Sequence, residues 1–244
     1  MATAERLPRA KRARADRFGR TVVYQGEILR HGVYTRVVHW AVAITFILAL
    51  LSGFALFTPW LYNWLAPLFG GGPMARLLHP WFGLAFVITM VLQALGWWQD
   101  MRWRANDREW LRRMRDYVTN AEKAEPDDVA KFNGGQKIWF WTMVISGVVF
   151  LITGLPLWFP GFFGRTGAWI SYFIHDVTAL IMLGGFFVHL YEGTAAIPGT
   201  FHSMTRGTVR EEWAWTHHPG WYREVTGRDP KADRERAGRT GPVV

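Results

Sequence analysis

The chain has 244 residues, of which 50% are hydrophobic, and its net charge is +9, from 28 Lys and Arg against 19 Asp and Glu. It contains no cysteine, which excludes disulfides and thiolate-ligated iron–sulfur clusters from this chain. Any redox centre that it holds must therefore use His or Met ligands.

Four runs carry few or no charges, and each has about 20 residues or more, the length that a helix needs to cross a hydrocarbon core of about 30 Å. Several of the 15 Trp stand at the ends of these runs, as in an interfacial aromatic belt. The pattern predicts an all-α membrane protein, a bundle of four transmembrane helices at about 37–57, 79–98, 138–159 and 170–192. The first run starts too late and is too long for a signal peptide, so we expect it to be retained.

The basic residues are distributed unevenly between the segments that separate these runs. Of the 28, 26 lie before residue 37, between 99 and 137, or after 193, whereas the other two loops hold only Arg76 and Arg165. The positive-inside rule then predicts that both termini and the middle loop are cytoplasmic, an N-in/C-in arrangement. Topology and contact with anionic lipid account for the basic N-terminal arm, so no nucleic-acid partner is needed to explain it.

The same pattern predicts three parts of the chain: a basic arm at 1–30, a four-helix domain at 31–225 and a flexible tail at 226–244. In the 99–137 loop, Trp103, Trp110, Met114 and Tyr117 recur near helical spacing among arginines. This predicts a short amphipathic helix on the cytoplasmic surface. The segment EKAEPDD at 122–128 is expected to form an acidic turn.

Four of the eight histidines, His39, His79, His175 and His189, lie in or at the mouths of the apolar runs. The topology places His39 and His189 near the inner face, and His79 and His175 near the outer face. The two histidines of the last run are 14 residues apart, which on a helix is roughly 21 Å along the axis and about 40° around it. They therefore share one side of the helix, and the depths predict two bis-histidine haems with ligand pairs His39/His189 and His79/His175.

Other interpretations of these histidines exist. A single histidine in a membrane helix can be a packing residue or a proton-relay site. A zinc site is disfavoured because the two pairs are far apart and lack carboxylates or thiolates. Residues one turn from the four ligands are small and would leave room for a porphyrin, although apolar helices are rich in small residues anyway. These residues are Ala43, Gly83, Ala179 and Gly185.

The chain resembles the cytochrome b556 (gamma) subunits of membrane-bound respiratory formate dehydrogenases. The resemblance runs from about residue 30 to 225 and is carried by five motifs. They are RVVHW at 36–40, RLLHPWFG at 76–83, KFNGGQKIWFW at 131–141, FIHDVTALIMLGGFFVHLY at 173–191 and HHPGWYRE at 217–224. The resemblance implies two b haems ligated by the four histidines, and a quinone site at Asn133, Gly135 and Gln136 beside His189.

The residue types alone leave the quinone site open. Free N–H groups at a helix start, with the Asn and Gln amides, can bind a quinone carbonyl. Asn133 could instead simply cap the helix that follows it. Glu192, three residues after His189, is hypothesised to deliver protons to the quinone, since ionisable groups within spans are often functional.

Three further polar residues have no role that the resemblance assigns. Asp176 is expected to bond a polar group on a neighbouring helix or subunit. His217 and His218 lie outside the spans and are interpreted as residues that fold the tail, with a role near the inner haem as the alternative.

The resemblance implies an electron-transfer subunit in a bacterial inner membrane. Electrons would pass from an iron–sulfur (beta) subunit on the periplasmic side, through the two haems, to menaquinone or ubiquinone near the cytoplasm. Formate would be oxidised on a molybdenum- or tungsten-pterin (alpha) subunit, not on this chain. A cytochrome b of a hydrogenase or thiosulfate reductase would share the haems and the quinone, and a transporter or structural anchor would lack haem.

Overall fold

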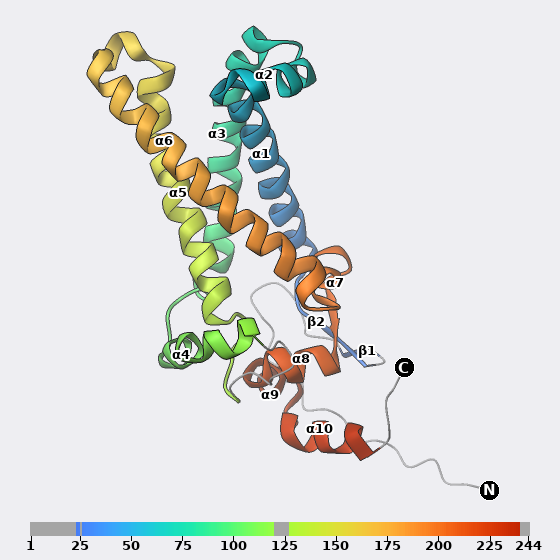
Figure 1. Cartoon of the computed structure of the whole chain (residues 1–244). Coiled ribbons are helices and arrows are strands. Elements are labelled where there is room, and N and C mark those ends of the chain that lie inside the picture. The colour runs from blue at the N-terminus through green and yellow to red at the C-terminus, as the bar shows by residue number, and fades with distance from the viewer. Residues whose placement is uncertain (1–22, 25, 120–126, 240–244) are drawn as a thin grey trace, which may run out of the picture. The chain divides into compact units, whose positions relative to one another are not determined.

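A computed structural model describes residues 23–24, 26–119 and 127–239 of the chain (Figure 1). The chain forms two compact units. The bundle unit comprises residues 33–102 and 136–192, and the polar unit comprises the residues up to 32, 103–135 and those from 193 onward. Residues 1–22 of the predicted basic arm, and most of EKAEPDD, lie outside the described residues.

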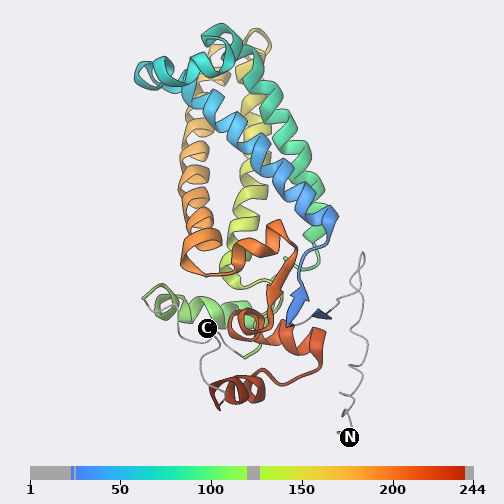
Figure 2. The same ribbon diagram turned by 90° about the vertical axis from the view of Figure 1, so that its right-hand side faces the viewer.

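Four long helices make up the bundle unit (Figures 1 and 2): α1 (Val33–Phe57), α3 (Gly72–Trp97), α5 (Gly134–Trp158) and α6 (Pro160–Tyr191). A short helix α2 (Pro59–Leu65) and a 3-10 turn η1 (Ala66–Phe69) connect α1 to α3. A π-helical turn, η2 (Glu192–Ala196), follows α6. The predicted helical membrane architecture with four spans is confirmed. Each long helix begins 4 to 10 residues before its predicted start and ends at its predicted end or one residue before it.

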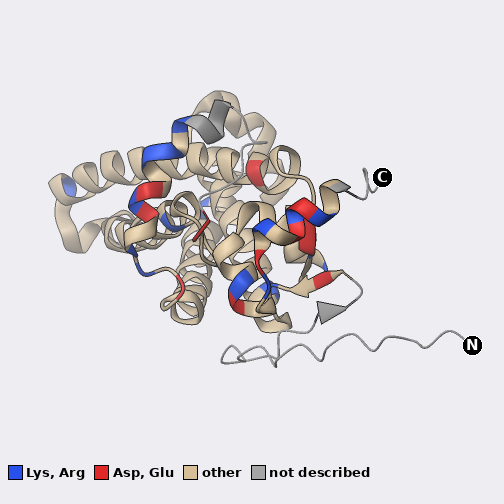
Figure 3. Cartoon of the chain, turned by 90° about the horizontal axis from the view of Figure 1, so that it is seen from below, with Lys and Arg blue, Asp and Glu red and all other residues tan. Residues whose placement is uncertain are grey.

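The surfaces of these helices are suited to lipid. Only 11–28% of the residues in their most apolar stretches are buried, and large apolar side chains such as Leu95 and Phe173 are exposed. The long helices carry almost no charge, whereas the acidic and basic residues concentrate elsewhere (Figure 3). Because water would oppose so much apolar exposure, a hydrocarbon environment is the physical explanation.

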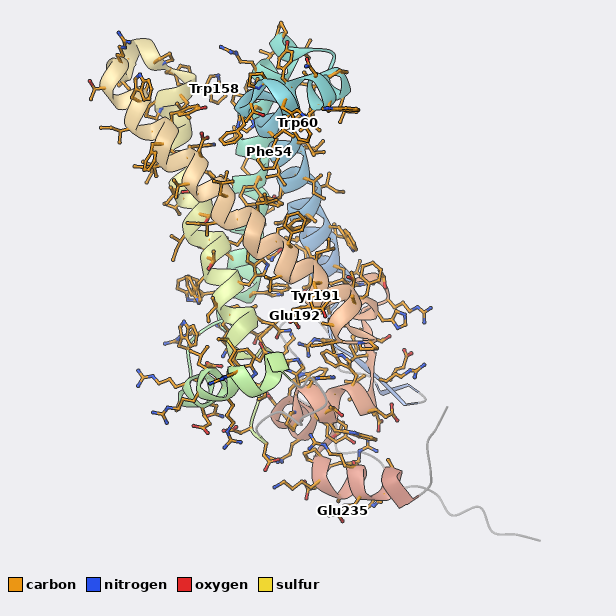
Figure 4. All side chains as sticks on the ribbon, viewed as in Figure 1. Phe54, Trp60, Trp158, Tyr191, Glu192 and Glu235 are labelled. Atoms are coloured by element: carbon orange, nitrogen blue, oxygen red, sulfur yellow. The ribbon has the colours of Figure 1, made fainter. Side chains whose placement is uncertain are left out.

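Aromatic rings pack the bundle helices against one another. Phe46 of α1 lies 5.7 Å from Phe86 of α3 and 5.4 Å from Phe186 of α6, between ring centres. Figure 4 shows Phe54, Trp60 and Trp158 towards one end of this unit and Tyr191 and Glu192 at the other. The positions of the histidines along the bundle are described relative to these two ends.

The polar unit contains a small antiparallel sheet in the order β1-β2-β3, formed by Val23–Tyr24, Glu27–Leu29 and Thr208–Arg210. Ile28 pairs with Val209. The last residues of the predicted arm are thus part of a sheet with residues from after the fourth span. The buried Ile28 and Val209 begin the apolar core of the unit, which Trp213, Trp221 and Tyr222 continue.

Five helices complete the polar unit: α4 (Ala105–Thr119), α7 (Thr200–Thr205), α8 (Glu211–His217), α9 (Pro219–Thr226) and α10 (Pro230–Arg239). The tail, which was expected to be flexible from residue 226, therefore contains a helix. The Tyr222 hydroxyl donates a 2.6 Å hydrogen bond to the Asp233 carboxylate and so joins α9 to α10. This contact joins two helices of the tail, and the periodicity of the sequence does not predict such a contact.

Helix α4 occupies the loop in which a short helix was predicted. Its Trp110 is buried, and a Cβ added at Gly135 would lie 2.8 Å from that indole. Trp103 precedes the helix, and both Trp103 and Met114 are exposed. Packing within the polar unit therefore engages one of the predicted apolar residues, and a position on the membrane surface stays a prediction.

A buried arginine joins three separate segments of the polar unit. The Arg30 guanidinium lies 4.8 Å and 5.0 Å from the ring centres of Trp213 and Trp221, in cation–π geometry. Its Nη2 donates to the Lys131 carbonyl and lies 3.2 Å from Nε2 of His218. His218 thus takes part in folding the tail, as interpreted from the sequence.

The hydrogen bonds of His218 define its protonation. Its Nδ1 lies 2.7 Å from the Ala130 carbonyl, which can only accept, so Nδ1 carries the proton and Nε2 accepts from Arg30. Burial lowers the pKa of His218 well below its ordinary value, and the nearby arginine lowers it further. The ring is therefore neutral at physiological pH.

Gly220 lies close to the backbone of Asp128 and Val129 in the polar unit, and we expect Gly220→Ala to destabilise this unit. An added Cβ would lie 2.8 Å from the carbonyl oxygens of Asp128 and Val129, which are backbone atoms and cannot rotate away. Overpacking of this kind costs about 1–3 kcal/mol. Hydrogen–deuterium exchange should show faster exchange of the α8 and α9 amides in the variant.

Gly238→Ala is the matched control, because a Cβ at this helical position would have no atom of the described residues within 4 Å. It should leave exchange in α8 and α9 unchanged. Equal protection of the α8 and α9 amides from exchange in the two variants would contradict the close approach at Gly220.

Candidate functional site

The four predicted ligand histidines come together in two pairs inside the bundle unit. His79 of α3 faces His175 of α6, with ring centres 6.2 Å apart. His39 of α1 faces His189 of α6, with ring centres 6.1 Å apart. The partners in space are those that the depths in the sequence predicted, and α6 contributes one histidine to each pair.

The spacing of each pair fits a metal ion held between the rings. When two imidazoles bind one metal from opposite sides, each bond is about 2.0 Å long and each ring centre lies about 1 Å further out, so the centres are about 6 Å apart. The interplanar angles of the two pairs are 70° and 55°. Edge-to-face ring packing gives similar distances and angles, so the geometry is compatible with bis-imidazole ligation, and the ligand roles stay predictions.

We call His79 and His175 the outer pair, and His39 and His189 the inner pair, after the sides of the membrane that the sequence predicts for them. Hydroxyl groups contact both rings of the outer pair. Nδ1 of His79 lies 3.0 Å from Oγ of Ser52 on α1. Nδ1 of His175 lies 2.9 Å from Oγ1 of Thr153 on α5. These contacts turn Nε2 of each ring away from the hydroxyl. In a metal-binding histidine, one ring nitrogen binds the metal and the other bonds a neighbouring polar group in this way.

Indole rings contact the inner pair. Trp139 of α5 stacks on His189 with ring centres 5.6 Å apart and an interplanar angle of 20°. Trp40 meets the neighbouring His39 ring edge-on at 5.5 Å. The inner pair is thus packed by indoles, whereas the outer pair has hydroxyl contacts together with a ring contact of 4.9 Å between the centres of Phe150 and His175.

One of the four small residues has a different role from the expected one. A Cβ added at Gly185 would lie 2.2 Å from the Trp139 ring, so this glycine seats the indole and does not leave open space for a porphyrin. Gly83, in contrast, has no atom within 4 Å of an added Cβ among the residues that the structure describes. The expectation was wrong for Gly185 because the indole arrives from another helix.

Comparison with known proteins places this arrangement in a family. The family model described as prokaryotic cytochrome b561 matches residues 30–207, a range that includes all four histidines. The chain belongs to the prokaryotic cytochrome b561 family. Membership implies haem b, which supplies one-electron redox chemistry when it is bound.

Individual relatives of this cytochrome support the resemblance seen in the motifs. The chain is 33% identical over 211 residues to the cytochrome b556(Fdn) subunit of the nitrate-inducible formate dehydrogenase of Escherichia coli K12, a match that covers 85% of this chain and 96% of the relative. It is 32% identical to the cytochrome b556(fdo) subunit of the same organism, with 81% and 93% covered. The Haemophilus influenzae formate dehydrogenase cytochrome b556 subunit is 31% identical, with 88% and 91% covered.

The predicted quinone residues of this cytochrome fall in both units. Asn133 and Gly135 belong to the polar unit, and Gln136, His189 and Glu192 belong to the bundle unit. Asn133 immediately precedes α5, so it stands where a helix-capping residue would also stand. The capping interpretation and the quinone interpretation are therefore compatible with the same position.

Asp176 of α6 and Glu192, which directly follows α6, both have local hydrogen bonds. The backbone N–H of Glu192 donates to the carbonyls of His189 and Val188, while its side chain is exposed at the end of the helix (Figure 4). Asp176 bonds Tyr172, one turn earlier on α6. Tyr172 lies on the same helix, whereas a partner on a neighbouring helix or subunit was expected, and a contact with another subunit stays a prediction.

Sequence inspection missed Ser52, Thr153 and Trp139. Hydroxyl residues in apolar helices usually bond the carbonyl one turn earlier, so their presence alone does not indicate a partner on another helix. Tryptophans at span ends are equally expected from interfacial anchoring. The contacts that make these residues part of the site exist only between helices.

We expect Gly185→Ala to disturb the inner pair selectively. The added methyl group would displace the Trp139 indole, and with it the ring stacked on His189. The variant should bind less haem b, or show an altered reduced absorption spectrum for one haem, when purified protein is compared with the wild type.

Gly184→Ala provides the neighbouring control. A Cβ there would meet no atom within 4 Å in the part of the chain that the structure describes, and Gly184 lies about 180° around the helix from His175. An equal change of the spectrum in both variants would contradict the conclusion that Gly185 specifically makes room for the Trp139 indole.

Proposed function

We propose that this protein is the di-haem membrane subunit of a formate dehydrogenase complex and passes electrons to quinone. The observation that carries the proposal is the pair of opposed imidazoles at two levels of one bundle, with ring centres 6.2 Å and 6.1 Å apart. Relatives that cover most of the chain are formate dehydrogenase cytochrome b556 subunits, which supports the choice of complex.

The four histidines have assigned roles in this proposal. His79 and His175 hold the outer b haem, and His39 and His189 hold the inner one. The apolar helices exclude water around both pairs, which limits solvent reorganisation during electron transfer. Ligation by neutral imidazoles agrees with the absence of cysteine from the sequence.

The proposed orientation follows from charge. With 26 of the 28 basic residues in the arm, the middle loop and the tail, these segments face the cytoplasm of a bacterial inner membrane. The outer pair then lies on the periplasmic side, where an iron–sulfur (beta) subunit delivers electrons from formate oxidised on a molybdenum- or tungsten-pterin (alpha) subunit. Each electron that moves inward does so against the membrane potential, which amounts to about 2.3 kcal/mol per 100 mV. The transfer therefore conserves energy.

The acceptor is proposed to be menaquinone or ubiquinone, bound near the cytoplasmic end. Asn133, Gly135 and Gln136 stand at the start of α5, where the first N–H groups of a helix have no intrahelical acceptor. Backbone and amide N–H groups are suitable donors to a quinone carbonyl. The resemblance of the motif FNGGQK to the formate dehydrogenase subunits supports assigning these residues together with His189.

Glu192 is proposed to carry protons to the reduced quinone. Its carboxyl group is exposed at the end of α6, three residues after His189. A carboxyl group at this end can exchange protons with the cytoplasm and accept or release them without moving the helix. This role is separate from haem ligation and can be tested separately.

His39→Ala should remove one of two b haems and stop quinone reduction, because it deletes one ligand of the inner pair. The outer haem should still be reduced by dithionite, and by formate in the intact complex. Haem content and the reduced α-band of the purified complex measure both effects. His202→Ala, at an exposed histidine of α7, is the control and should keep both haems.

A complex that retains two haems after His39→Ala would disprove the ligand assignment. A wild-type protein without any reduced b-type α-band would disprove the cytochrome function as a whole. The two results are read from the same spectra.

Glu192→Gln should slow formate-driven quinone reduction by about tenfold or more, because the amide cannot transfer protons. Reduction of both haems by formate should remain fast, since electron transfer precedes the quinone step. Stopped-flow absorption separates these phases. Glu212→Gln, at an exposed position of α8, is the control, and an unchanged quinone rate in Glu192→Gln would end the proposal for this residue.

A further inference from the structure

The outer histidine pair is contacted by the same dipeptide type twice, from two different helices. Ser52-Gly53 of α1 contacts His79, and Thr153-Gly154 of α5 contacts His175. In each case the hydroxyl reaches Nδ1, and the following glycine lies against the edge of the ring. An added Cβ would lie 3.0 Å from Cε1 of His79 at Gly53 and 3.9 Å from Cε1 of His175 at Gly154.

The hydroxyl protons are already engaged, which determines the direction of both bonds. Oγ of Ser52 donates to the Leu48 carbonyl at 2.7 Å. Oγ1 of Thr153 donates likewise to the Val149 carbonyl at 2.7 Å. Because a hydroxyl has one proton and two lone pairs, each oxygen can only accept from the imidazole.

Both outer imidazoles therefore carry their proton on Nδ1 and present an unprotonated Nε2. This is the tautomer that binds a metal through Nε2. The two hydroxyls, although on different helices, prepare both rings in the same way before any ligand arrives.

The inner pair lacks this arrangement among the described residues. Nδ1 of His39 is buried without a hydrogen-bond partner there, and the ring of His189 is contacted by Trp139 and His39. Stacking restrains the orientation of a ring but does not accept a proton from Nδ1. The imidazoles of the two pairs thus differ in how strongly they can donate electrons to a bound metal, as well as in their position along α6.

We propose that Ser52 and Thr153 are positioning residues that select Nε2 as the iron ligand and lower the reduction potential of the outer haem relative to the inner one. This inference rests on the proposed function, in which each pair holds a haem. An acceptor on Nδ1–H makes the imidazole a stronger electron donor, which stabilises the oxidised iron. Electrons that enter at the outer haem are then driven towards the inner haem and the quinone.

The test is a redox titration of both haems in the purified complex. Ser52→Ala and Thr153→Val each remove one acceptor, and each should make the outer haem easier to reduce. We expect about a tenfold change in its reduction equilibrium constant, equivalent to about 59 mV for a one-electron couple. The potential of the inner haem should not move, and the outer haem is identified as the one that remains in His39→Ala.

Conservative variants separate hydrogen bonding from packing. Ser52→Thr and Thr153→Ser keep the hydroxyl and should keep the wild-type potential. Thr45→Val is the matched control on α1, since Oγ1 of Thr45 donates to the Ala41 carbonyl at 2.7 Å and meets Oγ1 of Thr89 at 3.1 Å, not an imidazole. It should leave both potentials unchanged.

The outcomes distinguish this inference from the proposed function. A wild-type complex without haem would overturn the proposed function. Two haems with unmoved potentials in both Ser52→Ala and Thr153→Val would overturn only the inference, as would an equal shift in Thr45→Val. If the outer haem is lost from Ser52→Ala and Thr153→Val, its retention in Ser52→Thr and Thr153→Ser supports the inference, and its loss from those variants overturns it.

Discussion

The bundle depends on one constraint, which is that two opposed imidazoles must be held about 6 Å apart, twice, inside an apolar environment. An imidazole in hydrocarbon is costly unless its nitrogens have partners, so the helices that carry these rings cannot pack at arbitrary distances. Phenylalanines such as Phe46 and Phe186 contact each other between the two levels and keep α1 against α6. The spacing of the helices is thus adapted to the rings that face each other across them.

The two levels meet this constraint by different means. At the outer level, hydroxyls whose own protons are already bonded accept from the rings, and glycines let the rings approach. At the inner level, an indole seated on Gly185 covers one ring. A hydrogen bond sets orientation and tautomer together, whereas a stacked ring sets orientation alone. One bundle can therefore offer two chemically distinct sites with the same ligand type.

Much of this could be predicted from sequence because the relevant signals are periodic. Apolar length predicted the four helices, and the 14-residue interval between His175 and His189 predicted two levels on one side of α6. The motifs also indicated the family correctly. Ser52, Thr153 and the seat at Gly185 could not be found in this way, since their meaning arises only when one helix meets another. For the same reason the sheet that pairs Ile28 with Val209, residues 181 positions apart in the chain, was not foreseen.

Helix α6 supplies one histidine to each pair, so a single covalent element determines the separation of the two pairs along it. Their distance along the helix axis is set by the rise of one helix, roughly 21 Å for 14 residues, and not by how neighbouring helices slide. Thermal motion of α1 or α3 can tilt one ring, but it cannot change the interval between the levels. An insertion of one residue between His175 and His189 would turn one ligand by about 100°, so the length of this segment should tolerate no change in evolution.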